Sequence, residues 1–253
     1  MTVRSVSVET IEEPTEVRSD AVESRATPIL DARAVHKVYR TGSVEVPALK
    51  GIDLKVGAGE LVAVVGPSGC GKTTLLNCLS GLDEIDSGEV YIAGEEIHSM
   101  SDRRRTSYRG KAMGFVFQAF NLIPVFSAVE NVELPLLLNG VPPRDARDRA
   151  AEVLKGMGLL ARMQHKPTEM SGGEQQRVTI ARALATKPAI VWADEPTGNL
   201  DSETAQRVIE HLYLMNRAGL TIILVTHDGG IAADMPRLVT MRDGRIESDE
   251  TRR

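Results

Sequence analysis

Residues 66–74, "GPSGCGKTT", follow directly on "ELVAVV", an apolar run rich in β-branched residues that is typical of a buried strand. Their spacing is that of the phosphate-binding pattern G-x-x-x-x-G-K-[ST], and they stand between a predicted strand and a predicted helix, as the pattern requires. Backbone N–H groups of such a loop and the positive N-terminal end of the helix together attract phosphate oxygens. The stretch therefore predicts a site for a nucleoside triphosphate.

The residues of this loop have distinct expected roles. Gly66 can make the tight turn after the strand, and Gly69 and Gly71 let backbone N–H groups approach phosphate oxygens without a Cβ in the way. Lys72 is expected to reach the β and γ phosphates, and the Thr73 hydroxyl to complete the coordination shell of a Mg²⁺ ion. The other loop residues that we expect to line the nucleotide are Ser68, Cys70 and Thr74.

The composition sets outer limits on what the protein does. Its 253 residues suit one large α/β unit, or a core with an inserted lobe, and the net charge of -5 argues against a general nucleic-acid clamp. The longest apolar runs, "LPLLL" and "TIILV", are far below the roughly 20 residues needed to cross a bilayer. The two cysteines, both near the phosphate loop, exclude a disulfide framework and predict a reducing cytosol. The basic cluster "DRRRTSYRGK", residues 102–111, is expected to be a solvated surface.

Strand and helix signals alternate along the chain, with one interruption. Residues 1–28 are polar and acidic, lack a secretory signal and are expected to be disordered. Residues 29–117 and 188–248 predict an α/β core, with an antiparallel edge, later parallel strands, and helices after the phosphate loop, Asp201 and Asp228. Residues from about 118 to 187 predict helices only, the last of them ended by Pro188. We expect a helical subdomain inserted into an α/β core, with a C-terminal tail at residues 249–253.

A second group of candidate residues lies in "AIVWADEPTGNLD", residues 189–201. An apolar strand that ends in Asp194 places a carboxylate at the carboxyl edge of the sheet, beside the phosphate loop, where it can hold Mg²⁺ through water. Glu195 follows and would face the γ-phosphate, so it is the candidate base that deprotonates the attacking water. Two acidic residues at a strand end are often only a solvated turn, but beside a phosphate loop they complete the expected site.

A third candidate segment is "MSGGEQQRVTIARAL", residues 170–184. Ser171, Gly172 and Gly173 open a helix whose apolar positions recur at helical spacing. Small residues and free N–H groups at a helix start suit an anion, which would give the chain a second phosphate-binding helix start. An N-capped structural helix accounts for the same residues equally well.

Four segments, "GPSGCGKTT", "SGGEQQR", "ADEPTGNLD" and "TIILVTHD", occur in this order and span most of the chain after Ile29. In this combination the chain resembles the ATP-binding subunit of an ATP-binding cassette (ABC) transporter. The resemblance implies the ABC ATPase fold: an α/β P-loop NTPase core with an antiparallel β edge subdomain and an inserted α-helical subdomain. It also implies ATP and Mg²⁺ as cofactors and a second copy of the chain as partner. In this family two ATPase domains close head to tail, and the SGG helix of one caps the ATP held by the other.

The resemblance also implies roles for single residues. Tyr39 would stack on adenine, and Gln118 would sense the γ-phosphate, share the Mg²⁺ site and connect to the membrane partner. His227 would hold the γ-phosphate, forming the catalytic group with Lys72 and Glu195. At the interface between the two copies, the residues expected to contact the nucleotide are Ser171, Gly172, Gly173, Glu174 and Asp201. Without the family resemblance, Tyr39 could simply pack against the edge sheet and His227 could be a core residue.

Departures from the family pattern point to a subgroup. Met170 and Glu174 stand at the first and fifth positions of the usual LSGGQ signature. This form, with "FNLIPVFSAVENVELPL" after Gln118, resembles the MacB and LolD subgroup, the macrolide and lipoprotein exporter ATPases, whose permeases transmit force. The expected partner is then an integral membrane permease rather than nucleic acid, with the chain cytoplasmic and peripheral on the inner face of the cell membrane. Two alternatives stay open: a non-transporting membrane regulator resembling FtsE, and a soluble cassette ATPase.

Overall fold

The computed structural model describes residues 28–252. The segment expected to be disordered, residues 1–28, therefore lies outside the described residues except for Pro28. Those residues form two sheets, a four-stranded one in the order β2-β1-β4-β5 and a six-stranded one in the order β10-β9-β3-β8-β7-β6. The strands are β1 (Leu30–Thr41), β2 (Val44–Val56), β3 (Leu61–Val65), β4 (Ser87–Ile92), β5 (Glu95–Glu96), β6 (Met113–Phe117), β7 (Ile190–Asp194), β8 (Thr221–Val225), β9 (Arg237–Arg242) and β10 (Arg245–Thr251).

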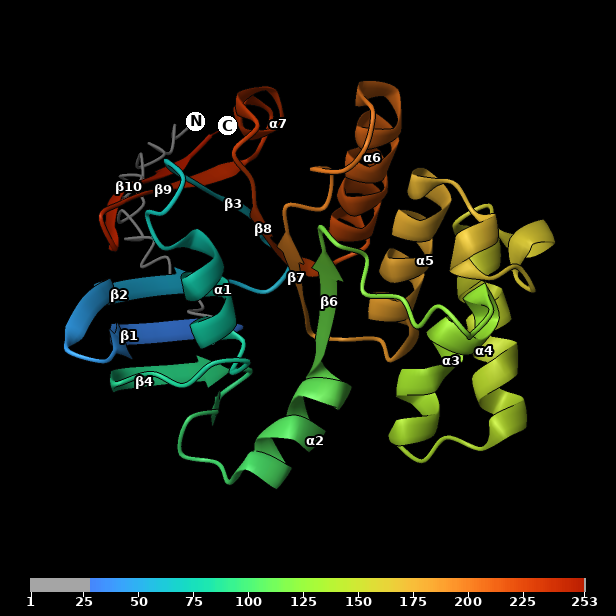
Figure 1. Cartoon of the computed structure of the whole chain (residues 1–253), viewed down its shortest axis with the longest axis horizontal. Helices are drawn as coiled ribbons and strands as arrows, with labels where there is room; N and C mark the ends of the chain where they lie inside the picture. The colour runs from blue at the N-terminus through green and yellow to red at the C-terminus, as the bar shows by residue number, and fades with distance from the viewer. Residues whose placement is uncertain (1–27, 253) are drawn as a thin grey trace, which may run out of the picture.

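Helices cover the sheets and form a layer of their own (Figure 1). They are α1 (Lys72–Leu79), α2 (Asp102–Ala112), α3 (Ala128–Leu138), α4 (Pro143–Gly156), α5 (Gly172–Ala185), α6 (Ser202–Arg217) and α7 (Gly229–Ala233), with two 3-10 helices, η1 (Leu160–Arg162) and η2 (Pro167–Glu169). The helices expected after the phosphate loop, Asp201 and Asp228 are α1, α6 and α7. Among residues 28–252, no helix is both long and apolar enough to span a bilayer.

The six-stranded sheet positions the candidate site. Its strands β3, β8, β7 and β6 pair in parallel, with Asp194 of β7 opposite Val225 of β8 and Phe117 of β6. Strands β3, β7 and β8 are almost wholly buried, which explains their continuous apolar sequences. Because the carboxyl ends of parallel strands meet at one edge, the phosphate loop after β3 and the carboxylates after β7 lie together there.

The antiparallel sheet packs on the same core. β1 and β2 form a long hairpin with register irregularities, and β1 also pairs with β4. Its inward residues Leu30 and Val56 belong to one buried cluster with Val64 of β3 and Trp192 of β7, and with residues of α1. The phosphate loop is therefore anchored between two sheets.

The segment between β6 and β7 contains α3, α4 and α5, which share a separate buried cluster of aliphatic residues and methionines. In Figure 1 these helices and the antiparallel sheet lie at opposite ends of the molecule, with β6, β7 and β8 between them. Local sequence sets the ends of the helices: Ser127 and Glu130 form a capping box at the start of α3, and α4 begins at Pro143. The α/β fold class is confirmed.

Two details differ from the sequence-based expectation. The cluster at residues 102–111 is a helix, α2, and none of its residues is buried, so it is indeed a surface but an ordered one. β10 continues to Thr251, beyond the boundary expected at residue 248. Its polar sequence carries no apolar alternation, and the strand forms because its backbone pairs antiparallel with β9.

Candidate functional site

A pocket at the carboxyl edge of the six-stranded sheet brings together most of the phosphate loop, the expected base-stacking residue and the expected catalytic base. It is lined by Ser68, Gly69 and residues 71–74 of the phosphate loop, by Tyr39 of β1, and by Glu195 after β7. Asp243 and Gly244, which the sequence did not single out, also line it. They form the turn between β9 and β10, and the Gly244 N–H donates to the carbonyl of Cys70 at 3.0 Å. The hairpin turn thereby fixes the phosphate loop.

Glycines let the phosphate loop pack closely on its neighbours. Gly66 has a φ of 150°, and a Cβ there would lie 2.2 Å from the carbonyl oxygen of Met241. Gly71 has a φ of 105°, and its Cβ would lie 2.7 Å from the carbonyl oxygen of Ala48. Any side chain at these two positions would displace the loop from β9 or β2. The Cys70 side chain is buried, so only its backbone is available to a ligand.

Lys72 is buried and its ammonium group lies along the loop itself. Nζ donates to the carbonyl oxygens of Gly66 at 2.8 Å and Pro67 at 3.0 Å. These acceptors are neutral, and a phosphate oxygen bound in the loop would be a stronger partner because it is charged. The position suits the expected role of Lys72 as a phosphate-binding cation.

Two of the three expected Mg²⁺ ligands lie side by side. The Thr73 hydroxyl donates to Oδ1 of Asp194 at 3.3 Å. Burial raises the pKa of the Asp194 carboxyl, and the charge of Glu195 adds to the rise, while Thr73 and Lys72 oppose it. A nearby cation stabilises the ionised form of a buried carboxyl group of this kind. Hard oxygen donors of this type suit Mg²⁺, which commonly takes one or two protein ligands and completes its shell with phosphate and water.

The third expected ligand, Gln118, does not reach this pair. It follows the residue of β6 that is paired with Asp194, but its side-chain amide donates to Oδ1 of Asn199 at 3.4 Å. Asn199 in turn donates to the Gln118 carbonyl at 2.9 Å. Gln118 is exposed and does not line the pocket, so in this conformation it connects β6 to the loop after Glu195.

Glu195 and His227 face each other at the mouth of the site. Nδ1 of His227 lies 2.8 Å from Oε2 of Glu195. The Glu195 backbone has a φ of 46°, an uncommon conformation for a residue with a side chain, and its N–H donates to the Val225 carbonyl at 2.9 Å. Such conformations persist where the surroundings enforce them, often at functional sites. His227 is an exposed side chain and not a core residue.

The Tyr39 side chain lines the pocket and does not pack within the core of the antiparallel sheet. Its side chain is exposed and lines the cavity, and its hydroxyl donates to Oδ2 of Asp83 at 2.8 Å. An aromatic ring with an open face beside a phosphate loop can stack on a base.

The SGG segment does not join the pocket. Ser171 caps α5, with its hydroxyl accepting from the Glu174 N–H and its own N–H donating to the Glu174 carboxylate. Gly173 is packed so closely against α6 that a Cβ would lie 2.3 Å from Cγ2 of Thr204. Asp201 caps α6 by accepting from the Thr204 N–H at 3.0 Å. These residues form a second cluster, separate from the phosphate loop of the same chain.

Sequence and structure comparisons agree on the family. The family model described as "ABC transporter" matches residues 49–198. A lipoprotein-releasing system ATP-binding protein LolD from Xanthomonas euvesicatoria is 47% identical over 234 residues, covering 91% of this chain and 96% of that protein. An uncharacterized ABC transporter ATP-binding protein from Thermotoga maritima is 46% identical, covering 88% of this chain and 96% of that protein.

Among solved structures, one similar chain is the ATP-binding cassette MJ0796, described as a dimer in a post-hydrolysis state bound to ADP and Pi. It aligns with a TM-score of 0.82 and 42% sequence identity, covering 88% of this chain and 99% of that one. The chain belongs to the ABC transporter family, as one of its ATP-hydrolysing cassettes.

Proposed function

We propose that this ATPase binds Mg²⁺–ATP at the pocket beside Lys72, closes head to tail on a second copy of itself, and drives a membrane permease of the lipoprotein-releasing or macrolide-exporting type. One observation carries the proposal: the phosphate loop and the candidate base Glu195 share one pocket, whereas Ser171 and its helix start form a separate cluster. A site divided in this way is completed when two chains meet head to tail. The dimeric relative bound to ADP and Pi supports this arrangement.

In the proposed reaction the residues in and beside the pocket have distinct tasks. Lys72, which now donates to two loop carbonyls, would donate to phosphate oxygens instead, and Thr73 and Asp194 would hold the metal ion. Mg²⁺ would neutralise charge that develops on the phosphate oxygens. Glu195 accepts the proton of the attacking water, and His227, which lies 2.8 Å away, keeps that carboxylate in place. Ser171 and Gly172 of the second copy would donate to the γ-phosphate from their helix start.

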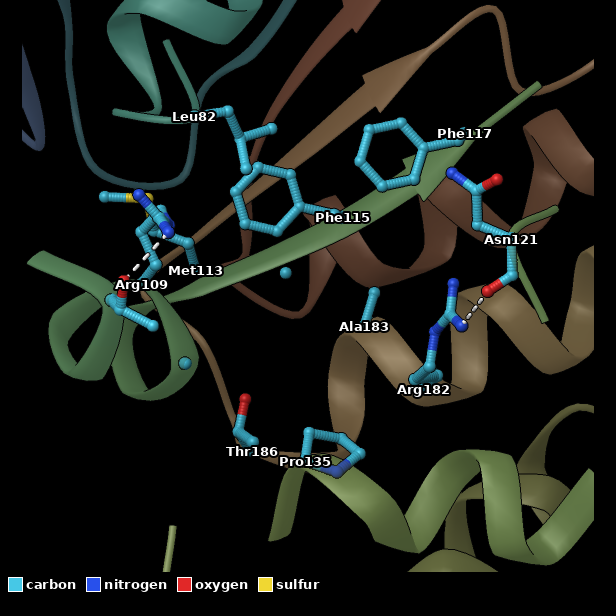
Figure 2. A pocket seen from close by; sticks show the side chains of 13 residues that line it. Leu82, Arg109, Met113, Phe115, Phe117, Asn121, Pro135, Arg182, Ala183 and Thr186 are labelled. Atoms are coloured by element: carbon cyan, nitrogen blue, oxygen red, sulfur yellow. Dashed lines mark hydrogen bonds between the residues drawn. The ribbon is translucent and has the colours of Figure 1, made fainter. Parts of the chain in front are cut away.

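A groove next to Gln118 offers a surface for the permease (Figure 2). Its walls come from β6, α2, α3 and α5, and its apolar lining includes Leu82, Phe115, Phe117 and Pro135. The two phenylalanine rings are stacked, with centroids 5.9 Å apart. Leu82 is 44% exposed, so the groove presents apolar surface to a partner.

The groove is also linked to the catalytic edge of the sheet. Phe117 pairs with Asp194 across the sheet, and Gln118 follows it directly. On the other wall, Arg182 of α5 donates to the carbonyls of Phe120 and Asn121, the segment that leaves β6. A shift of α5 on closure of the dimer would therefore move both walls of the groove. That movement would be transmitted to a permease segment bound in the groove. We place the protein in the cytoplasm, on the inner face of the cell membrane, through this contact.

The permease partnership is tested by capture from gently solubilised native membranes. The bait is Glu195→Gln with ATP, and the matched control is Lys72→Ala, which should bind the nucleotide much more weakly. We expect mass spectrometry to find a permease with few membrane spans and a large external domain on the first bait, and much less on the second. Leu82→Asp in the Glu195→Gln background should release it. Recovery of division proteins would instead favour the FtsE-like regulator, and exclusively soluble partners would contradict the transporter assignment.

A further inference from the structure

The loop that follows α1 reaches across to the ring of Tyr39. Asp83 stands four residues after the last residue of α1, and its backbone N–H donates to the Asn77 carbonyl at 3.1 Å, which ties the loop to the helix. Its two carboxylate oxygens have different partners on β1: Oδ2 accepts from the Tyr39 hydroxyl at 2.8 Å, and Oδ1 accepts from Lys37 Nζ at 2.9 Å. One carboxylate thus holds two side chains of β1 at once.

Lys37 acts on Tyr39 a second time, through the ring. Its Nζ lies 5.1 Å from the ring centroid, within the range of a cation–π contact. The same ammonium donates to the Glu84 carbonyl at 2.7 Å, so its position is fixed by the loop after α1 as well. Lys37 does not line the nucleotide pocket, whereas Tyr39 does. Lys37 therefore covers one face of a ring that itself lines the pocket.

An exposed tyrosine near the end of a strand would ordinarily sample several rotamers, and only one of them would present the ring to a base. Here a hydrogen bond fixes the far end of the ring and a cation covers one face, so the ring is already oriented before a base arrives. α1, which begins at Lys72 of the phosphate loop, links that loop to Asp83. The helix that begins at the phosphate loop therefore leads directly to the carboxylate that holds Tyr39 of β1.

We infer that Asp83 is a positioning residue for the nucleotide base: together with Lys37 it sets the ring of Tyr39 so that one face is presented to adenine. The inference rests on the proposed role of Tyr39 as the base-stacking residue. Asp83 does not line the pocket, so it acts through Tyr39 and not on the nucleotide.

The test compares a ligand that has a base with one that lacks it. ADP and inorganic pyrophosphate, each with Mg²⁺, are titrated calorimetrically into the full-length protein and its variants. Asp83→Ala should lower the affinity for ADP about three- to tenfold, as loss of one side-chain hydrogen bond predicts. It should leave the affinity for pyrophosphate almost unchanged. Tyr39→Phe, which keeps the ring but removes the hydroxyl, should have a similar selective effect. In steady-state assays both variants should raise KM for ATP with little change in kcat.

A double-mutant cycle and a matched control separate positioning from a general structural effect. In a Tyr39→Ala background, Asp83→Ala should cause no further loss of ADP affinity. Glu84→Ala removes a neighbouring, exposed carboxylate that does not contact Tyr39, and it should leave the ratio of the two affinities unchanged. Thermal unfolding checks that each variant is folded.

Two results would overturn the inference, provided that Tyr39→Ala selectively lowers the affinity for ADP. Asp83→Ala could lower the affinities for ADP and pyrophosphate equally, or it could change neither affinity. In those cases the proposed function stands. If Tyr39→Ala itself left the ratio unchanged, the adenine-stacking assignment would fail, and the role of Asp83 with it.

Discussion

Nδ1 of His227 lies 2.8 Å from Oε2 of Glu195, across the carboxyl ends of two adjacent parallel strands. Glu195 holds this position with a φ of 46°, and its N–H is bound to the Val225 carbonyl. The candidate base is therefore fixed from both its backbone and its side chain. The first two predictions follow from this pair.

Glu195→Gln should lower the rate of ATP hydrolysis by about a hundredfold or more, because an amide cannot take the proton of the attacking water. The amide oxygen can still face His227, so the fold and ATP affinity should change little. Phosphate release measures the rate, and calorimetric titration measures binding. A variant that hydrolyses ATP at near the wild-type rate would show that the base is another group.

His227→Ala should lower kcat by about tenfold or more, since the carboxylate of Glu195 loses the side chain that orients it. ATP affinity should fall by a smaller factor, because Lys72 and the phosphate loop are intact. The change in kcat, measured by phosphate release, is to be compared with the change in Kd for ATP, measured by titration. If Kd rose as much as kcat fell, His227 would be mainly a binding residue.

Lys72→Ala should weaken ATP binding by at least about tenfold, because the loop loses its one charged donor. The fold should persist, since the lysine contacts only two neutral loop carbonyls, Gly66 and Pro67. Circular dichroism would verify the fold, and titration would measure the affinity. Unchanged affinity for ATP would contradict the phosphate-loop assignment.

Gly173→Ala tests the packing of α5 on α6. Its Cβ would lie 2.3 Å from Cγ2 of Thr204, and we expect a loss of about 1–3 kcal/mol of unfolding free energy from overpacking. Thr204→Ser removes that methyl group and keeps the hydroxyl that donates to Asp201, so it should restore most of the loss. Urea unfolding of the two single variants and the double variant measures the interaction free energy between positions 173 and 204. Additive effects would mean that the two helices are free to separate here.

Asp83 gives a pH-dependent prediction. Burial acts to raise the pKa of its carboxyl, but hydrogen bonds from Lys37, Tyr39 and the Glu84 N–H outweigh it, so the pKa lies below its usual value. A lowered pKa means that the ionised group stabilises the fold above the unfolded-state pKa of about 3.9, and that this stability is lost as pH falls through the folded-state value. Asp83→Ala should thus be less stable than wild type at pH 7, with the difference shrinking below about pH 4. A constant difference down to pH 3 would contradict this account.

Local motifs predicted the parts of the site whose geometry is set within a short stretch of chain. The strand before Gly66, the loop and the helix starting at Lys72 are one continuous unit, and Asp194 ends a strand of unmistakably buried composition. Tyr39 was placed by its family resemblance, and the pocket includes it. The position of His227 beside Glu195 depends on the parallel pairing of β7 with β8, which the order of strands in the sequence does not fix.

Other features could not be predicted because they depend on contacts between distant segments. The turn at Asp243 and Gly244 carries an ordinary hairpin signal, but nothing local shows that it packs on the phosphate loop. The side chain of Gln118 was expected at the metal, and it is bound to Asn199, a residue 81 positions away. α2 has no apolar face to give a periodic pattern, so its helical form was not evident.

Light scattering of full-length Glu195→Gln at saturating Mg²⁺–ATP shows whether one ATP site is completed by two chains. We predict twice the mass of one chain with ATP and the mass of one chain without it. We also predict that adding Ser171→Arg, which places a bulky cation at the exposed start of α5, abolishes the dimer. A single-chain mass with ATP, or a dimer unaffected by Ser171→Arg, would contradict a site completed by two chains.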